Sequence, residues 1–171
     1  MRKSQKNNQT IDCHLPLIID TREQAPFFYD KLSHPDYQDP PIQLIHTSLK
    51  TGDYSIKGFE DFITIERKSL SDLYQSIGRG RARFQREFER MSQLQFAAVV
   101  IEADLETITT NPPPTTQMSP KSVFRTIVTW CQRYRIPFFP CPNRSFAEKT
   151  TYLLLKSFWQ DHSVAMRGAA A

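Results

Sequence analysis

The chain has 171 residues and a mass of 19.9 kDa, which is enough for one well-buried domain and too little for two. With 39% hydrophobic and 23% charged residues, the composition excludes a disordered or fibrous protein, and no apolar run is long enough to span a membrane. Basic residues number 22 against 18 acidic ones, and the whole net charge of +4 falls within residues 67–91, which hold seven basic and three acidic side chains.

The first half of the chain is predicted to consist mostly of strands. Residues 1–12 are polar and aperiodic, which indicates a flexible N-terminal arm before a single domain over 13–162. Four apolar or alternating segments are predicted to be strands: 15–20, 42–49, 53–56 and 62–66. The prolines between Gln24 and Pro41 predict a long loop after the first strand, because proline bars regular structure.

The second half is predicted to alternate helices with strands. Three helices are expected: from a cap at Ser69 or Ser71 to Ile77, from Ala82 with Phe84, Phe88, Met91 and Leu94 on one face, and from Ser119-Pro120 to Tyr134. A capping box of Ser145 and Glu148 predicts a last helix to about Asp161, followed by a disordered tail over 163–171. A strand is predicted over 96–102; it is the most apolar one and is expected to be central in the sheet. A proline-rich break follows at 111–116, and a short strand is predicted over 136–139. This order predicts an α/β fold with one mixed sheet flanked by helices.

Two carboxylates and a lysine are predicted to meet at one end of this sheet. Asp53 starts a short strand and Glu66 ends the next one, so a hairpin would bring the two side chains together. Lys68 points to the same side as Glu66, because alternate residues of a strand share a face. Carboxylate oxygens suit Mg²⁺ or Mn²⁺, and such a metal beside a lysine can hydrolyse phosphodiester bonds.

Two further acidic groups are expected close to this point. Asp20, Arg22 and Glu23 follow the first strand, and Asp72 comes four residues after Lys68 at the start of a helix. Each group also has an ordinary structural explanation. The helix dipole favours Asp72 at its position, and Glu23 can simply pair with Arg22.

These segments resemble the active-site signature of the XPF-type nucleases, a branch of the PD-(D/E)XK superfamily. The segments are Ile19-Asp20-Thr21-Arg22-Glu23, Gly52-Asp53-Tyr54 and Glu66-Arg67-Lys68-Ser69-Leu70-Ser71-Asp72-Leu73. The resemblance covers about residues 15–160 and implies a restriction-endonuclease-like α/β core with divalent-metal-dependent cleavage of DNA. It also implies a preference for branched or junction-containing duplexes and a place in DNA repair or recombination. The signature is complete, which argues against the inactive partner subunits of the family.

The resemblance assigns two sets of residues. The expected ligands of Mg²⁺ or Mn²⁺ are Asp53, Glu66, Asp20, Glu23 and the backbone carbonyl of Arg67. The other expected catalytic residues are Lys68, which would act on the nucleophilic water or the phosphate, and its supporting neighbours Arg22 and Asp72.

The basic stretch follows directly on this signature and is predicted to bind the DNA backbone. The expected contacts are Arg79, Arg81, Arg83 and Arg86. A charge excess confined to one segment is typical of a face that binds a polyanion. The alternative is a solvated helix face on which Glu87 and Glu89 pair locally.

The last helix is apolar around more than one face, which, together with the family resemblance, predicts a homodimer through the C-terminal helices. The chain has three cysteines and no C-x-x-C pattern, which argues against a disulfide framework or a zinc site and favours a reducing compartment. We therefore expect a cytoplasmic protein of prokaryotic or phage type, or a nuclear protein in a eukaryote, without a membrane partner.

The family usually carries a tandem helix-hairpin-helix module, and such hairpins need glycines. No glycine lies between residues 81 and 167, so the sequence predicts a stand-alone nuclease without that module. Two alternatives stay open at this point: a non-catalytic DNA-binding or scaffold subunit of a nuclease complex, and a nuclease that acts on single strands or RNA.

Overall fold

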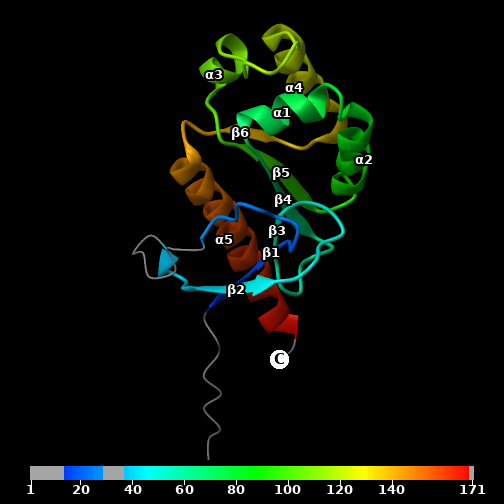
Figure 1. The fold of residues 1–171 in the computed structure, drawn as a ribbon. Coiled ribbons are helices and arrows are strands. Elements are labelled where there is room, and N and C mark those ends of the chain that lie inside the picture. Colours follow the sequence, from blue (N-terminus) through cyan, green and yellow to red (C-terminus); the bar gives the residue numbers. More distant parts are fainter. Residues whose placement is uncertain (1–13, 29–36, 170–171) are drawn as a thin grey trace, which may run out of the picture.

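The computed structural model describes residues 14–28 and 37–169, with side chains as far as His162, so the predicted arm over 1–12 lies outside the described residues. Six strands form one mixed sheet in the order β2-β1-β3-β4-β5-β6 (Figure 1). They are β1 (Leu15–Ile19), β2 (Ile42–His46), β3 (Tyr54–Ile56), β4 (Ile63–Lys68), β5 (Phe96–Ile101) and β6 (Phe138–Pro140). The predicted α/β fold with a mixed sheet is confirmed.

The strand directions bring the strand ends that carry the predicted site residues to the same end of the sheet. Strand β3 runs antiparallel to both of its neighbours, β1 and β4, whereas β1 with β2 and β4 with β5 and β6 are parallel pairs. The start of β3 therefore lies beside the ends of β1, β4 and β5. The predicted hairpin of β3 with β4 is confirmed, and β5 lies inside the sheet, next to the edge strand β6.

Helices cover both faces of the sheet (Figure 1). Helices α1 (Leu70–Ile77), α2 (Arg81–Met91) and α4 (Pro120–Tyr134) lie on one face, and α5 (Arg144–Ala169) crosses the other. A short helix that the sequence did not predict, α3 (Leu105–Thr110), begins where the Asp104 side chain accepts a hydrogen bond of 2.7 Å from the Thr107 N–H.

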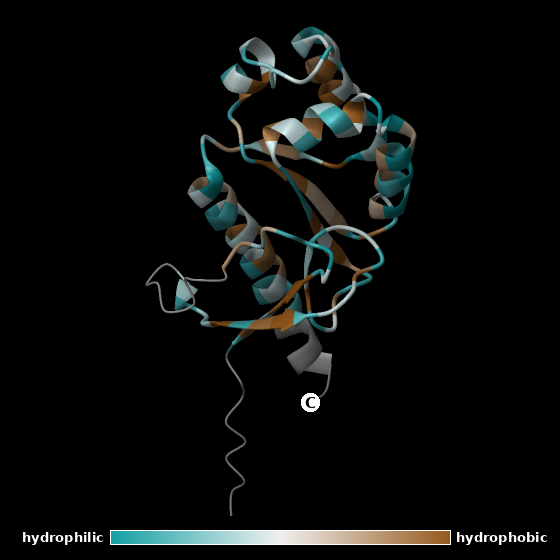
Figure 2. Cartoon of the chain, viewed as in Figure 1, coloured by the Kyte–Doolittle hydropathy of each residue, from teal (hydrophilic) through white to brown (hydrophobic). Residues whose placement is uncertain are grey.

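Strand β5 shows why the sheet is covered on both sides. Its residues alternate between the two hydrophobic clusters, with Ala98 and Val100 facing α5, and Val99 facing α2 and α4. Figure 2 shows the strands as brown ribbons between helices whose outer surfaces are mostly teal. Burial of each valine stabilises the fold by roughly 1.5–3 kcal/mol, so the sheet is the rigid support of the site.

Several element boundaries differ from the sequence prediction. Helix α2 ends at Met91, so Leu94 lies in the turn beyond it and is only half-buried. The strand predicted over 42–49 stops at His46, where pairing with β1 ends.

The start of α5 is also different from the prediction. Asn143, and not Ser145, accepts the hydrogen bond of 2.9 Å from the Phe146 N–H, while Glu148 is buried and accepts a hydrogen bond of 2.7 Å from the Tyr37 hydroxyl. Helix α5 continues to Ala169, into the segment predicted as a disordered tail. No described helix is both long enough and apolar enough to cross a membrane.

Candidate active site

Acidic side chains lie at the ends of three neighbouring strands, at the same end of the sheet. Asp20 follows β1, Asp53 precedes β3, and Glu66 lies near the end of β4. The Asp20 N–H donates to the Asp53 carbonyl at 2.8 Å, and the Asp53 N–H donates to the Ile65 carbonyl at 2.9 Å. The main chain of Asp53 is thus hydrogen-bonded to both neighbouring strands, which holds the carboxylates at this edge together.

The predicted site residues share one cleft of about 750 Å³. All eight line it: Asp20, Arg22, Glu23, Asp53, Glu66, Arg67, Lys68 and Asp72. The lining is polar on nearly every side, with contributions from the loops after β1 and before β3, from β4, and from helices α1 and α2. The clustering that the sequence pattern predicted is therefore what the fold produces.

Glu66 and Lys68 form an ion pair between the Glu66 Oε1 and the Lys68 Nζ. Only 3% of Glu66 is exposed, and burial together with the nearby Asp53 charge raises its pKa well above the ordinary value. Burial opposes the charged form of Lys68, but the Glu66 and Asp53 charges outweigh it and raise the pKa of the lysine. The Lys68 ammonium also lies 5.0 Å from the centre of the Phe84 ring, so the lysine holds its proton in this pocket.

Asp53 is the second carboxylate of the cleft with a raised pKa, and it is half-buried. Burial raises its pKa from 3.8 to about 6, although the Lys68 charge and a hydrogen bond of 2.8 Å from the Arg67 N–H to Oδ2 act in the opposite direction. Two carboxyl groups that are both hard to ionise next to each other are typical of a site built to receive a cation.

We expect Asp53→Asn to stabilise the folded chain at neutral pH. The folded-state pKa of Asp53 lies above its unfolded value, so the wild type loses stability as pH rises from about 4 to about 6 and regains none above that range. Asparagine does not ionise and escapes this loss. Thermal unfolding in EDTA should show a higher Tm for the variant at pH 7.5 and no advantage at pH 4. The exposed Asp161→Asn serves as the control; parallel curves for Asp53→Asn and wild type across the range would contradict the prediction.

Asp20 lines the cleft but does not present free oxygens to it. Its Oδ1 accepts from the Arg22 N–H and Nε at 2.7 and 2.8 Å, and its Oδ2 accepts from the Arg22 Nη2 and the Leu49 N–H at 2.9 and 2.6 Å. Burial alone would raise the pKa of Asp20, but these hydrogen bonds lower it. The four bonds occupy the lone pairs of the carboxylate and join the loops after β1 and before β3, and a part for Asp20 in the metal site stays a prediction.

Glu23 and Arg67 belong to a second, adjacent cluster. The Arg67 Nη1 donates to the Glu23 Oε1 at 3.1 Å, and the Arg67 Nε donates to the Glu102 Oε1 at 2.5 Å. The guanidinium therefore points away from Asp53, while the Arg67 main chain holds the Asp53 carboxylate. Glu102 was not predicted, although it directly follows the most apolar strand, at the sheet edge where site residues gather.

Arg144 completes this cluster from the first turn of α5, and no sequence pattern points to it. Its Nη1 donates to the Glu102 Oε1 at 2.9 Å, and its Nη2 donates to the carbonyls of Ala25 and Pro26 at 2.8 Å. The guanidinium also lies 4.9 Å from the centre of the Phe27 ring, which Arg67 approaches at 5.3 Å. Arg144 thereby fastens the loop that carries Glu23 to the end of β5.

We expect Arg144→Ala to loosen that loop without removing a group of the cleft. Three hydrogen bonds are lost from a side chain that is 42% exposed, so the expected cost is about 1 kcal/mol, or a Tm lower by roughly 2–4 °C. Thermal unfolding and limited proteolysis after Arg22 measure both effects. Arg125→Ala, on the exposed face of α4, is the matched control and should change neither.

Some arginines of the basic stretch line the cleft or a space beside it, and others do not. Arg83 and Arg90 line the cleft from α2, and Arg79 and Arg83 line an adjoining hollow of about 440 Å³ with Lys68 and Asp72. Arg86 is exposed and lines neither of these two spaces.

Arg81 lines neither of these two spaces, and its contact with DNA stays a prediction. Its Nη1 donates to the Thr126 Oγ1 at 3.1 Å and its guanidinium lies 5.1 Å from the centre of the Trp130 ring. Arg81 thus connects α2 to α4. Arg83 lines the cleft instead, because residues two apart on a helix point in nearly opposite directions.

Two acidic side chains on the helices complete the cleft. Asp72 accepts a hydrogen bond of 2.6 Å from the Ser69 hydroxyl, whose oxygen in turn caps α1 by accepting from the Asp72 N–H. Glu87 lines the cleft from α2, and its charge contributes to the raised pKa of both Asp53 and Glu66. In the sequence analysis Glu87 enters only in the alternative of a solvated helix face on which it pairs locally, because the face of α2 that meets the cleft depends on the fold.

The donor set of the cleft consists of oxygen atoms. Asp53 and Glu66 each use one carboxylate oxygen in the hydrogen bonds given above. In the part of the chain that the structure describes, no three His, Cys, Asp or Glu side chains stand close enough together to hold a metal ion by themselves. A cation at this point would therefore need main-chain oxygen or water in addition to the two carboxylates.

Comparison with known proteins gives one family and one fold. The family model described as "ERCC4 domain" matches residues 19–154. XPF from Aeropyrum pernix has a similar fold, with a TM-score of 0.60 and 18% identity over 91% of this chain and 68% of that one. The same archaeal protein in complex with DNA gives a TM-score of 0.59 and 20% identity over 89% of this chain and 66% of that one, so this chain spans about two thirds of each. No curated protein sequence matches the chain.

Proposed function

The chain belongs to the ERCC4 domain family, and on that basis we propose that it is a divalent-metal-dependent DNA endonuclease that acts on branched or junction-containing DNA. The observation that carries the proposal is the meeting of Asp53, Glu66 and Lys68 in one polar cleft. The DNA in the complex of the similar archaeal XPF supports nucleic acid as the substrate. The complete set of signature residues in the same cleft supports a catalytic role over a scaffolding one.

The cleft fits Mg²⁺ or Mn²⁺ by the chemistry of its donors. Asp53 and Glu66 are carboxylates with raised pKa values, which a bound cation would lower again, and the carbonyl of Arg67 would be a third oxygen donor. Mg²⁺ commonly keeps several waters and takes only one or two carboxylates from the protein, as this set provides. When bound, the metal would polarise a phosphoryl oxygen and acidify the attacking water.

Lys68 contributes a fixed positive charge beside this site. Its raised pKa keeps it protonated at neutral pH, which favours orienting the water and offsetting negative charge on the phosphate over accepting a proton. Glu66 keeps the ammonium in place through the ion pair, and the Phe84 ring supports it from the side of α2. The charge is thereby positioned before substrate arrives.

Arginines on the rim supply the grip on the phosphate backbone. Arg83 and Arg90 line the cleft and Arg79 lines the adjoining hollow, all three exposed. Arginine side chains bind phosphate oxygens in pairs and fix the position of a duplex without reading its sequence. Arg22, whose side chain is 69% exposed while it holds Asp20, adds a cation to the cleft from the loop after β1.

The decisive experiment is cleavage of a panel of labelled substrates by the wild-type chain. Flap, fork, splayed and linear DNA, together with single-stranded DNA and RNA, are incubated with Mg²⁺, Mn²⁺ or EDTA. We expect cleavage of branched DNA that depends on the metal and stops in EDTA. Binding of DNA without any cleavage would favour the non-catalytic subunit, and cleavage confined to single strands or RNA would replace the substrate proposed here.

We also propose that the chain pairs with a second copy through α5. Phe146 and Leu153 are 55% and 50% exposed on this helix, and an apolar groove of about 430 Å³ lies between α5 and the β5–β6 side of the sheet, lined by Leu153, Leu154 and Phe158. Light scattering after size exclusion should give twice the mass of one chain. Leu153→Asp should return the mass to that of a monomer, whereas Gln132→Asp on α4 should not.

A further inference from the structure

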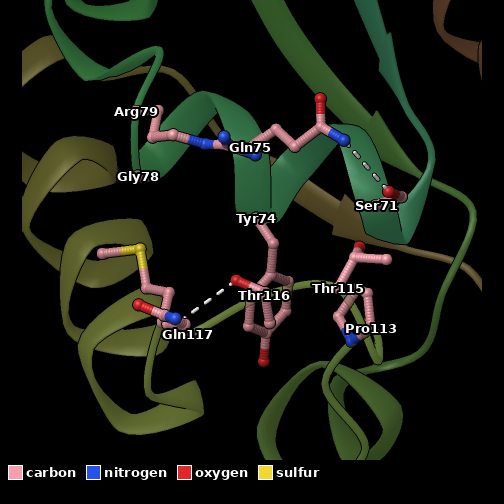
Figure 3. A pocket seen from close by; sticks show the side chains of 10 residues that line it. Ser71, Tyr74, Gln75, Gly78, Arg79, Pro113, Thr115, Thr116 and Gln117 are labelled. Carbon is pink, nitrogen blue, oxygen red and sulfur yellow. Dashed lines mark hydrogen bonds between the residues drawn. The ribbon is translucent and has the colours of Figure 1, made fainter.

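A second pocket lies beyond the cleft, between α1 and the loop that leads into α4 (Figure 3). Its volume is about 320 Å³, within the range of pockets that hold small organic groups. Helix α1 contributes Ser71, Tyr74 and Gln75, and the loop contributes Thr115, Gln117 and Met118. None of the eight predicted catalytic and metal-site residues lines this pocket.

The pocket neighbours the catalytic cleft by way of the adjoining hollow. The cleft and the adjoining hollow share Lys68, Asp72 and Arg83, and the hollow and the second pocket share Gln75 and Arg79. The connection runs along α1, which is eight residues and therefore about 12 Å long. Arg79 stands at the junction, and within the described residues it has no ion-pair partner, so its guanidinium is available to a phosphate.

The walls carry donors and acceptors together with soft apolar surface. The amides of Gln75 and Gln117 each offer a carbonyl and an NH₂ group, which is the pairing that side-chain amides use on the edges of bases. The Gln75 Nε2 makes only a long hydrogen bond of 3.5 Å to the Ser71 Oγ. The partly buried Met118 thioether adds an apolar surface on which a flat group can pack.

These walls are held by the fold before any ligand arrives. The Tyr74 hydroxyl donates to the Ile108 carbonyl at 2.7 Å, and the Thr116 Oγ1 accepts from the Met118 N–H at 3.1 Å. The loop also includes Pro113, whose ring restricts the backbone. At Gly78 a Cβ would lie 3.3 Å from the Met118 Sδ, so glycine lets the loop approach the end of α1.

We propose that this pocket receives an unpaired nucleotide of the substrate, with its base between Gln75, Gln117 and Met118 and its phosphate at Arg79. The inference rests on the proposed nuclease function and adds a point of recognition for the branched part of the substrate. A duplex cannot enter a pocket of this size, because both bases of a pair would have to fit. A single extruded base can enter it. At the roughly 3.4 Å rise of one strand, the 12 Å along α1 corresponds to about three or four nucleotides from the catalytic lysine.

The test compares two DNA substrates with the same duplex cleavage site, one carrying an unpaired arm and one without it. Gln117→Trp fills the mouth of the pocket, and Gln132→Trp makes the same change at an exposed position of α4 outside it. Fluorescence anisotropy in Ca²⁺ measures binding without requiring cleavage. In a second measurement, 5-iodouracil is placed at each of the first unpaired positions, and photocrosslinks are mapped by mass spectrometry.

We expect Gln117→Trp to weaken binding of the arm-bearing DNA about tenfold, to leave the duplex unchanged, and to lose a crosslink to Met118 that the wild type forms. Gln132→Trp should behave as wild type with both substrates. Equal weakening of both substrates by Gln117→Trp, or no weakening and no crosslink, would overturn the inference and leave the nuclease proposal intact. Normal arm-dependent binding without metal-dependent cleavage would overturn the nuclease proposal alone.

Discussion

Lys68→Met is expected to reduce cleavage of branched DNA by about 10²- to 10³-fold while leaving the affinity for DNA within a few-fold of wild type. Methionine keeps an unbranched apolar side chain and removes the ammonium that lies 5.0 Å from the centre of the Phe84 ring. The loss should appear in kcat, because the ammonium is fixed in place by Glu66 and acts where negative charge develops. Single-turnover cleavage with Mg²⁺ and anisotropy in Ca²⁺ measure the two quantities separately.

Two controls separate chemistry from folding in this experiment. Removing the counter-ion leaves Glu66 buried, but its already raised pKa allows it to take up a proton, so Tm at pH 7 should fall only modestly. Lys121→Met, at an exposed position of α4, should cleave as wild type. A Lys68→Met protein that is folded, binds DNA and retains wild-type kcat would remove the lysine from the mechanism.

Gly52→Ala is expected to produce the largest loss of stability. Gly52 has a φ of +74°, and a Cβ there would lie only 1.9 Å from the Oγ1 of the buried Thr64. The strained backbone and the overlap together should cost about 3 kcal/mol, which corresponds to a Tm lower by roughly 6–12 °C for a chain of this length. Because Asp53 follows directly, cleavage should fall as well, even at temperatures where the variant is folded.

Gly58→Ala is the matched control for this substitution. Gly58 also has a positive φ, +86°, but a Cβ would meet nothing within 4 Å, so only the backbone strain of about 1 kcal/mol applies. The second substitution Thr64→Ala should recover part of the loss in Gly52→Ala, as a double-mutant cycle would reveal. If the two glycine variants lost the same amount of stability, the close approach of Thr64 would not be the reason for glycine at position 52.

Local patterns in the sequence were sufficient to predict the central elements. The Ser69 cap of α1 is confirmed because the hydroxyl and the N–H that it satisfies lie within one turn. The hairpin of β3 and β4 is confirmed because short turns leave few ways for the strands to pair. Helix α3 was missed, since its six residues carry too little periodicity for a prediction.

The clustering of the acidic residues could be predicted, but their states could not. The sequence placed Asp20, Asp53 and Glu66 at one sheet edge, and all three line the same cleft. Hydrogen bonds from Arg22 and Leu49 occupy the lone pairs of Asp20, whereas burial raises the pKa of Asp53 to about 6. Those contacts join segments whose relative position is decided only when the sheet assembles.

The charge that distinguishes residues 67–91 shows the same division between sequence and structure. Composition and spacing determined that the net charge of +4 lies beside a carboxylate and lysine motif, because both are properties of consecutive residues. Only the tertiary structure decided that Arg83 lines the cleft whereas Arg81 packs on Trp130. The reason is physical: the helical period spreads neighbouring side chains around the axis, and the rotation of α2 is set by the burial of Phe84, Phe88 and Met91 against the sheet and α4.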